Sequence, residues 1–474
     1  MSQEPKKVGL IGLIALTVSS VIGGGIYHLM TDIAGKAGLM AALLALLLSG
    51  LGMGVFVFCL QNLNDRLPHL DAGIYAYAQE AFGPLTGFIS ALGYWLSMLC
   101  ANVALGSFAF AGLGYFFPAL GDGSNLYSVL FASLTLWLMH WIILKGSNFA
   151  SIVNMVITFV KLLPLALFIL LAIISFKMEV FTTDVWGLSS HPFTWTAFLS
   201  QVSKAMVVIV WVYVGIEGAI VYSARAKSKK IVGKANLLGF ALISLIYLAV
   251  VALSYGIMTK AQLMDLSKPA MGQIMESMVG HWGAVLINGA VAISAMGAWF
   301  ACTMFSGEVV YQAAKEEVFP KIFLGENEHG APRNALLITN LLVQLFFLSL
   351  LINKSAYNFM ALLASSTMLV PYFLVSLGQM KLSFKWAKSW DKQVLLGVLA
   401  SLYMGFCILA TGWQYLLVTS LLFAPGMLIY YHARKQRGDQ IFNTYEKLAA
   451  ILLVLLALFS ILAIAMGWIN IRTL

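Results

Sequence analysis

Three consecutive glycines, Gly23–Gly25, interrupt the apolar stretch at residues 8–30 near its middle. Because glycine has no side chain and weakens helical structure, we expect the helix to unwind there. The N–H groups of Gly24, Gly25 and Ile26 would then begin a second half-helix and could hold a carboxylate with the aid of the helix dipole. Non-helical backbone at membrane depth is tolerated where it lines a cavity, so this break is a candidate binding site.

A second glycine-containing run, Trp211 to Gly218, lies near the middle of the apolar stretch at residues 197–224. Carbonyls released by a break near Gly215, together with those of the first half-helix, could hold an α-ammonium group. Glu217 could bind a cationic side chain or carry a proton, and a structural hydrogen bond to a neighbouring helix is its alternative role. Two matched breaks are typical of a transporter's central site, whereas a single pair of small residues favours plain helix packing.

Four ionisable side chains fall well inside apolar stretches: Lys161, Lys204, Glu217 and Glu308. Each would cost at least about 2.5 kcal/mol if exposed to lipid at the bilayer centre, so each needs a partner or water. Lys161 could be a proton site or a fixed cation, and the residues leave both open. Lys204 is expected to extend to the membrane interface, and Glu308 is expected to act as a gate or as scaffold.

Aromatic side chains accompany these positions. Trp211 directly precedes the second break, and Trp299 lies in the middle of the stretch at residues 282–313. Tyr94 and Trp95 lie together in an earlier stretch. Aromatic faces in a dry cavity attract a cation by about 2 kcal/mol, so these residues could line the side chain of a basic guest. Core packing is the alternative for each of them.

The composition requires a membrane environment. Of the 474 residues, 61% are hydrophobic and 10% are charged, whereas soluble domains carry about a quarter charged residues. About thirteen stretches are apolar and long enough to cross a bilayer. They are residues 8–30, 38–61, 85–117, 126–145, 149–176, 197–224, 232–257, 282–313, 335–352, 356–380, 393–411, 413–432 and 446–470. We therefore expect an all-α polytopic membrane protein in which residues 1–474 form a single transmembrane transporter domain.

Other classes of protein are disfavoured. The net charge of +9 arises in the loops, and most of the 28 Lys and Arg residues fall on the side that a cytoplasmic N-terminus assigns to the cytosol. The charge thus indicates topology and not nucleic-acid binding. No His-Glu-x-x-His pair and no Ser/His/Asp grouping falls at membrane depth, so no catalytic residue, metal or cofactor is expected. The cysteines, which lie in apolar stretches without metal-type spacing, are interpreted as packing residues: Cys59, Cys100, Cys302 and Cys407.

Four segments resemble those of the amino acid, polyamine and organocation superfamily. They are the break Ile22–Ile26, the loop Asp71–Ala78, the helical residues Asn102–Ala104 and the run Trp211–Glu217. Within the superfamily, the chain is similar to the basic amino acid and polyamine antiporters. The resemblance is greatest to the arginine/ornithine antiporter group and its histidine/histamine and arginine/agmatine relatives, and it extends from about residue 6 to the C-terminus.

The resemblance implies a 5+5 inverted-repeat core with discontinuous helices 1 and 6. The repeats would span residues 8–176 and 197–380, and additional C-terminal helices would span 393–470. It also implies one central site in which Gly24 and Gly25 hold the carboxylate. The expected substrate-binding residues are Gly23, Gly24, Gly25, Ile26, Tyr94, Asn102, Trp211, Gly215 and Trp299, and the expected gating or proton-linked residues are Glu217 and Lys161.

The resemblance has two departures near the first break. Position 24 is glycine where several exchangers have serine, which removes a hydroxyl group from the expected carboxylate site. Residues Tyr27–Met30 replace an aromatic-Leu-Leu-Pro run, so outer gating and side-chain selectivity do not carry over directly. Among them, His28 could be a gate, a pH sensor or a packing residue.

The expected function is exchange of an extracellular basic amino acid, arginine first, for ornithine or a decarboxylated amine such as agmatine. Alternatives are a histidine/histamine or other exchanger, and proton-coupled uptake, which Lys161 favours. A channel and an intramembrane enzyme are the alternatives from other classes. The expected location is the inner cell membrane, with a cytoplasmic N-terminus, lipid as the surrounding partner and a functional link to a decarboxylase or deiminase pathway. The sequence leaves a homodimer open.

Overall fold

The fold is helical throughout the ranges that the computed structural model describes, which are residues 7–70, 73–187, 193–267, 269–351, 356–440 and 442–469, without the side chains of 356–358. In these ranges no strand forms, and Val8 and Ala226 make an isolated parallel bridge. Asp71 and Ala72 of the resembling loop lie outside the described residues.

Twelve helices in the described part of the chain are long and apolar enough to cross a membrane. They are α3 (Leu39–Arg66), α5 (Pro84–Gly114), α6 (Leu126–Leu144), α7 (Ser147–Ile174), α9 (Trp195–Val212), α11 (Lys229–Tyr255), α14 (His281–Lys315), α15 (Arg333–Leu350), α16 (Ala356–Ala387), α17 (Lys392–Thr411), α18 (Trp413–Lys435) and α19 (Thr444–Ala465). They match twelve of the thirteen predicted spans. The remaining span, residues 8–30, is divided among shorter helices.

Short helices complete the chain and include the pieces of the broken spans. They are α1 (Leu10–Val21), η1 (Gly25–Tyr27), α2 (Leu29–Ala34), α4 (Ile74–Phe82), η2 (Pro118–Leu120), α8 (Met178–Phe181), α10 (Gly218–Val221), η3 (Ser223–Arg225), α12 (Lys260–Met264), α13 (Ala270–Val279) and η4 (Lys321–Leu324). The predicted division within residues 393–432 is confirmed, because Gly412 adopts φ +100° between α17 and α18.

Local sequence explains where several long helices begin. Asn125, Thr194 and Asp391 each accept hydrogen bonds from backbone N–H groups in the first turn of the following helix. Asn443 and Glu446 form a reciprocal capping box at the start of α19. Such caps satisfy N–H groups that have no partner inside the helix, so they define the helix starts.

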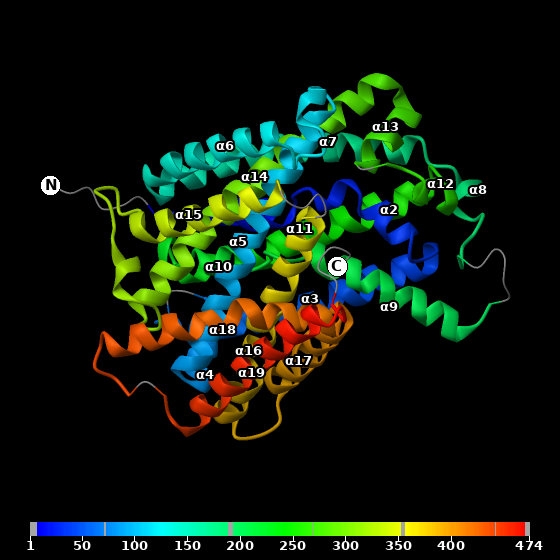
Figure 1. Cartoon of the computed structure of the whole chain (residues 1–474). Coiled ribbons are helices and arrows are strands. Elements are labelled where there is room, and N and C mark those ends of the chain that lie inside the picture. Colours follow the sequence, from blue (N-terminus) through cyan, green and yellow to red (C-terminus); the bar gives the residue numbers. More distant parts are fainter. Residues whose placement is uncertain are drawn as a thin grey trace.

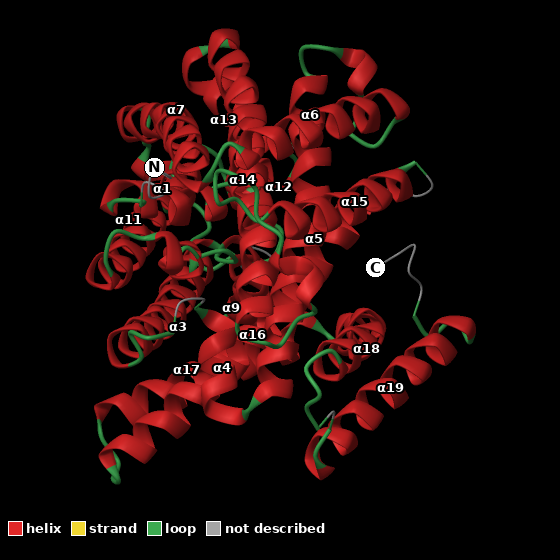
Figure 2. Ribbon diagram, turned by 90° about the vertical axis from the view of Figure 1, so that its left-hand side faces the viewer, coloured by secondary structure: helices red, strands yellow, loops and turns green. Residues whose placement is uncertain are grey.

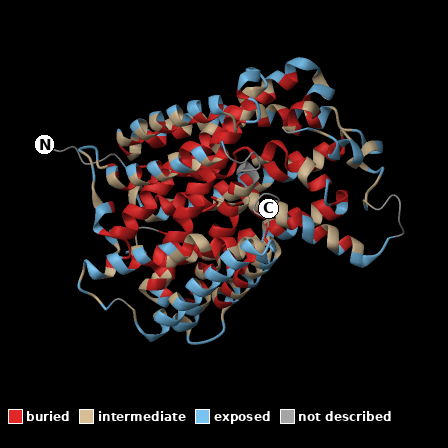
Figure 3. Cartoon of the chain, viewed as in Figure 1, coloured by how far each residue is buried: buried red, intermediate tan, exposed pale blue. Residues whose placement is uncertain are grey.

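The centre of the bundle is formed by α5, α14 and α16, which are mostly buried, whereas α19 and α7 have the smallest buried shares among the described spans. Figure 1 shows the helices running side by side, and Figure 3 shows buried residues at the centre with exposed residues outside. In the orientation of Figure 2, α18 and α19 lie on the opposite side of the bundle from α1, α7 and α11. Large apolar side chains are exposed along the outer helices, as expected for a surface that lipid covers.

Candidate functional site

The first predicted break is present. Helix α1 ends at Val21, and η1 begins at Gly25. Ile22 has φ −77° and ψ 84°, which lies outside helical geometry. The N–H groups of Gly24, Gly25 and Ile26 have no hydrogen-bond partner among the described residues. These backbone donors at the start of a half-helix have the arrangement that binds anions.

The second predicted break is also present, between Val212, where α9 ends, and Gly218, where α10 begins. Gly215 adopts φ +100°, and a Cβ atom placed there would lie 3.1 Å from the Cβ atom of Ser20. The position therefore favours glycine both by its backbone conformation and by the close approach. The Ser20 hydroxyl donates a 2.8 Å hydrogen bond to the Gly215 carbonyl, so the two breaks are in direct contact.

Side chains of the protein hold the carbonyls at the end of α1. The Lys161 ammonium, from α7, donates to the Ser19 carbonyl at 2.9 Å, to the Ile22 carbonyl at 2.6 Å and to the Ser19 hydroxyl at 3.1 Å. The Ser294 hydroxyl, from α14, lies 3.2 Å from the carbonyl oxygens of both Ile22 and Gly23. The expectation that these carbonyls are free for a ligand's ammonium group therefore needs revision.

Carbonyls near the second break have partners as well. The Tyr247 hydroxyl, from α11, donates to the Val212 carbonyl at 2.7 Å, and the Gly215 carbonyl accepts from Ser20. The Gly215 carbonyl also accepts from the Gly218 N–H at 3.1 Å, which uses both of its lone pairs. The Val212 carbonyl has the Tyr247 hydroxyl as its one donor among the described residues, so a ligand's ammonium group could share it. The N–H groups of Gly24, Gly25 and Ile26 are thus the unpartnered donors of the first break within the described chain.

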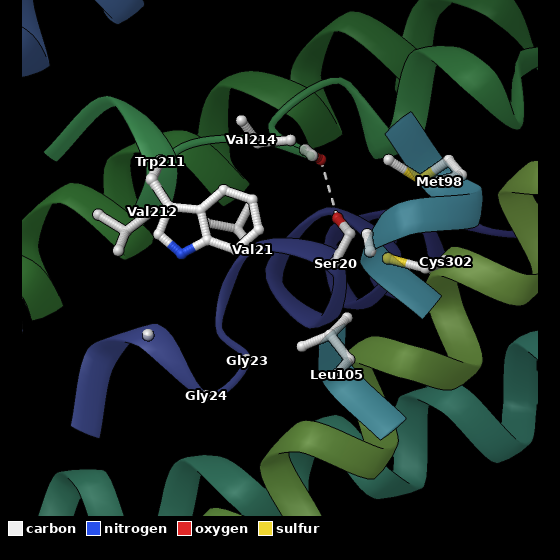
Figure 4. A pocket seen from close by; sticks show the side chains of 13 residues that line it. Ser20, Val21, Gly23, Gly24, Met98, Leu105, Trp211, Val212, Val214 and Cys302 are labelled. Atoms are coloured by element: carbon white, nitrogen blue, oxygen red, sulfur yellow. Dashed lines mark hydrogen bonds between the residues drawn. The ribbon is translucent and has the colours of Figure 1, made fainter. Parts of the chain in front are cut away.

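A cavity lies between the two breaks and the central helices (Figure 4). The space amounts to about 490 Å³ including its open mouth. Figure 4 shows the Trp211 indole on one side and Leu105, Met98 and Cys302 on the other. Its lining residues are Ser20, Val21, Gly23, Gly24, Gly25, Met98, Ala101, Leu105, Trp211, Val212, Val214, Gly215 and Cys302.

Five predicted substrate-binding residues line this cavity, and four do not. The five are Gly23, Gly24, Gly25, Trp211 and Gly215. Asn102 lies behind the lining and donates to the Met98 carbonyl at 2.6 Å, while its Oδ1 atom accepts from Thr303 at 2.5 Å. Trp299 is fully buried and packs edge-on against Phe347, with ring centroids 5.6 Å apart. Ile26 and Tyr94 are buried outside the lining, and the substrate roles of these four residues stay predictions.

Glu217 is fully buried just beyond the second break and does not line the cavity. The Tyr372 hydroxyl, from α16, donates a hydrogen bond to the Glu217 carboxylate and accepts one from the Gly215 N–H at 3.1 Å. Tyr94, from α5, lies beside the same carboxylate. Glu217 therefore joins the broken segment to α16, which is the structural role that the sequence left open beside proton transfer.

Several lining and supporting residues were not predicted. Met98, Ala101 and Leu105 have the i, i+3, i+7 spacing of one helix face, so the helical period around Asn102 could have indicated them. Cys302, interpreted from the sequence only as packing, is buried and also lines the cavity. Tyr372 lies far along the chain from the residues it contacts, and no local pattern marks it.

His28, which follows η1, is buried and packs edge-on against Phe108, with ring centroids 5.0 Å apart. Phe108 also covers Gly24, because a Cβ atom at position 24 would lie 2.1 Å from the Phe108 ring. The aromatic ring thus occupies the space that a serine side chain at position 24 would need.

A second polar cluster connects several elements on the side predicted to face the cytosol. The Arg225 guanidinium forms a 2.9 Å ion pair with Glu308 and donates to the Gly330 carbonyl at 3.1 Å. Gln312 donates to the same Glu308 carboxylate at 2.6 Å. The Val8 N–H donates to the Arg225 carbonyl at 2.8 Å, so the start of α1 belongs to this cluster too. Lys204, in contrast, is exposed, as expected for a side chain at the interface.

In this helical membrane bundle, two broken helices border a small cavity with their exposed backbone N–H and C=O groups. This is the architecture of a secondary transporter. The chain belongs to the amino acid permease family, whose model matches residues 8–428.

Curated relatives match nearly the whole chain. An arginine/ornithine antiporter of Pseudomonas aeruginosa is 38% identical over 461 residues, which cover 94% of this chain and 95% of that protein. An arginine/ornithine antiporter of Latilactobacillus sakei is 39% identical and covers 98% of both chains. An arginine/agmatine antiporter of Chlamydia abortus is 35% identical, with 98% of this chain and 97% of that protein covered. The relatives are transporters, which agrees with the expectation that the chain is not an enzyme.

Proposed function

We propose that this permease exchanges an extracellular basic amino acid, with arginine as the first candidate, for ornithine or a decarboxylated amine such as agmatine. The near full-length relatives named as arginine/ornithine and arginine/agmatine antiporters support this substrate class. The observation that carries the proposal is the set of unpartnered N–H groups at Gly24 and Gly25 beside a cavity that Trp211 borders.

The head group would bind at the first break. The N–H groups of Gly24 and Gly25 would donate to the substrate carboxylate, and Gly23 and Ile26 would set the backbone on either side. The α-ammonium group would share the carbonyl of Val212, a lining residue whose carbonyl accepts from the Tyr247 hydroxyl alone among the described residues.

The side chain of the substrate would be recognised mainly by aromatic and sulfur-bearing residues. No Asp or Glu occurs among the described lining residues, so a guanidinium group would not meet a carboxylate directly. Trp211 would cover the bound guest and offer its face to the cation. Trp299, Tyr94 and Asn102 lie behind the lining, and we propose that they join the site when the bundle closes on the substrate.

Alternating access would follow from movement of one group of helices against the rest. We propose that residues 8–176 and 197–380 form the two inverted repeats, with 393–470 as additional helices, because each repeat then begins with one of the two broken helices. Glu217 would control this movement through Tyr372, which bonds to both its carboxylate and the Gly215 N–H.

We propose that the protein resides in the inner cell membrane with a cytoplasmic N-terminus, since most of its Lys and Arg residues then face the cytosol. Exchange of an amino acid for its metabolic product would link the transporter to a decarboxylase or deiminase. A homodimer is compatible with the exposed apolar helices.

The decisive experiment uses purified protein in liposomes. Vesicles are loaded with ornithine, agmatine, histamine or nothing, and entry of radiolabelled arginine and histidine is measured. We expect arginine entry into ornithine- or agmatine-loaded vesicles to exceed entry into empty vesicles at least tenfold. Equal entry into loaded and empty vesicles would exclude exchange and favour proton-coupled uptake, the rival that the buried Lys161 supports.

Trp211→Ala tests the site in the same assay. Because the indole borders the cavity, its removal is expected to raise the arginine KM at least tenfold, since a desolvated cation–aromatic contact contributes about 2 kcal/mol. Trp282→Ala is the matched control, because Trp282 is half exposed on the outside of α14. Equal effects of the two substitutions would contradict a substrate contact at Trp211.

A further inference from the structure

An apolar groove lies away from the central cavity, at the end of the bundle predicted to face the cytosol. It has a volume of about 740 Å³ including its open side. Its apolar lining comes from the end of α4, the last turns of α16, the turn that follows and the start of α17: Phe82, Leu377, Met380, Phe384, Trp390 and Val394. Lys381 is the charged residue at this groove. The groove therefore combines an apolar floor with a cationic edge.

Lysines accumulate along this edge. Lys381 and Lys385 have the i, i+4 spacing of one helix face, Lys388 directly follows the end of α16, and Lys392 begins α17. All four side chains are exposed, and none has an ion pair within the described part of the chain. Like charges that lie close together repel one another. The edge of the groove therefore carries a positive charge that no acidic side chain of the described chain compensates.

The acidic residue in this turn does not compensate the charge. The Asp391 carboxylate accepts hydrogen bonds from the N–H groups of Gln393 and Val394, at 3.0 and 2.9 Å, and thereby caps α17. Lys381 is also partly engaged, since it donates to the Ala81 carbonyl at 2.7 Å and lies over the Phe82 ring. Lys385, Lys388 and Lys392 have no such contact in the described chain and are the available cations.

Lys388 has an unfavourable backbone conformation. Its φ of 52° is left-handed, and its N–H closes the end of α16 by donating to the Phe384 carbonyl at 2.9 Å. Glycine is the residue that this helix-ending position favours. A lysine in this conformation makes the protein locally less stable than a glycine would. Backbone strain of this kind is often found at functional sites.

Trp390 indicates where this groove lies relative to the bilayer. Its side chain is 74% exposed, and it packs edge-on against Phe384, with ring centroids 6.1 Å apart. Exposed tryptophans next to lysines are typical of the membrane–water interface. The apolar floor would thus face acyl chains, while the lysines would face the head groups.

We propose that this groove binds one anionic phospholipid, with an acyl chain along Leu377, Met380 and Phe384 and its phosphate beside Lys385 and Lys388. The charge complementarity favours an anionic head group over a zwitterionic one, because cationic residues near the membrane surface attract acidic lipids. The apolar floor favours a lipid over a soluble anion. The site is separate from the transport cavity and does not depend on which substrate is exchanged.

Native mass spectrometry of the delipidated full-length protein tests the proposal. The protein is titrated with phosphatidylglycerol and with phosphatidylcholine that carries the same acyl chains. We expect one tightly retained phosphatidylglycerol, with at least tenfold weaker retention of phosphatidylcholine. Equal retention of the two lipids would overturn the proposal, and so would displacement of phosphatidylglycerol by inorganic phosphate, because that result defines a site for soluble anions.

Two double variants test whether lipid retention depends on this groove or only on the positive charge of the protein surface. Lys385→Gln combined with Lys388→Gly removes two of the three available cations, and the glycine also relieves the left-handed backbone, so we expect the fold to be preserved. We expect this variant to lose retention of phosphatidylglycerol at least tenfold. The control combines Lys435→Gln with Lys447→Gln, two exposed lysines on the same predicted side, and should retain the lipid. Equal loss in both double variants would refute a defined site.

A third variant tests the apolar floor. Leu377→Trp fills part of the groove without changing any charge. We expect it to weaken retention of phosphatidylglycerol about tenfold, while a short-chain analogue with the same head group is affected less. Unchanged retention of the long-chain lipid would show that no acyl chain occupies the groove and would overturn the proposal.

Discussion

Lys161 has a complete set of hydrogen-bond partners in its charged form. An ammonium group offers three donors, and the structure provides three acceptors, two on Ser19 and one on Ile22. The negative end of the α1 dipole lies at the same place and favours a cation. Of the two roles that the sequence leaves open, the contacts therefore favour a fixed cation that stabilises the end of the first half-helix.

Lys161→Met tests this role. Without the ammonium group, the buried carbonyls of Ser19 and Ile22 lose their donor, and each lost partner costs about 1–3 kcal/mol. We expect the melting temperature to fall by several degrees and exchange to be lost. A pH-sensitive dye inside the vesicles should record no proton movement coupled to exchange by the unmodified protein.

Lys204→Met provides the control for Lys161, because Lys204 is exposed and its loss should leave both stability and exchange close to normal. Stoichiometric proton movement with each arginine transported would contradict a transporter without a proton site and would place that site at Lys161 or Glu217.

At the scale of elements, the close approach of η1 to α5 determines what position 24 can hold. A Cβ atom on Gly24 would overlap the ring of Phe108, and the same ring packs against His28. The departure from serine at this position therefore has a physical reason in this chain, since the aromatic ring from α5 fills the space. The contact with Phe108 also gives His28 a packing role, which is one of the three roles that the sequence leaves open.

Gly24→Ser is consequently expected to reduce exchange at least tenfold, because the new side chain must displace Phe108 and distort the carboxylate site. The double variant Gly24→Ser with Phe108→Ala restores space and should recover a substantial part of the activity in the liposome assay. Phe108→Ala alone serves as the reference. A double variant no better than Gly24→Ser would show that the loss has a cause other than this overlap.

The sequence predicted where helices 1 and 6 break, but it did not predict which side chains contact the broken segments. Glycine acts locally, so Gly23–Gly25 and Gly215 were sufficient to indicate where helices 1 and 6 unwind. The partners of Lys161 and the hydroxyl of Tyr372 depend on how distant helices pack, and no periodic pattern encodes that. Cys302 was indistinguishable from a packing residue for the same reason, since lining a cavity is a property of the assembled bundle.

At the scale of the whole molecule, the cluster around Arg225 connects distant parts of the chain at the predicted cytosolic end. This cluster joins four parts of the chain: the residues before α1, the end of the second broken helix, α14 and the loop that contains Gly330. An opening of the central cavity toward this side must separate them. The Arg225–Glu308 ion pair is therefore expected to set the balance between closed and open arrangements, as one of the two roles predicted for Glu308.

Glu308→Gln keeps the shape of the side chain but removes the ion pair, and Cys302 can report the result from inside the cavity. A weakening of the closed arrangement by about 1.4 kcal/mol would increase the open population tenfold. In protein whose other cysteines are replaced by serine, we expect about tenfold faster labelling of Cys302 by a maleimide applied from the cytosolic side. Glu328→Gln, an exposed carboxylate of the same loop, should leave the rate unchanged. If Glu308→Gln did the same, the cluster would be scaffold and not a gate.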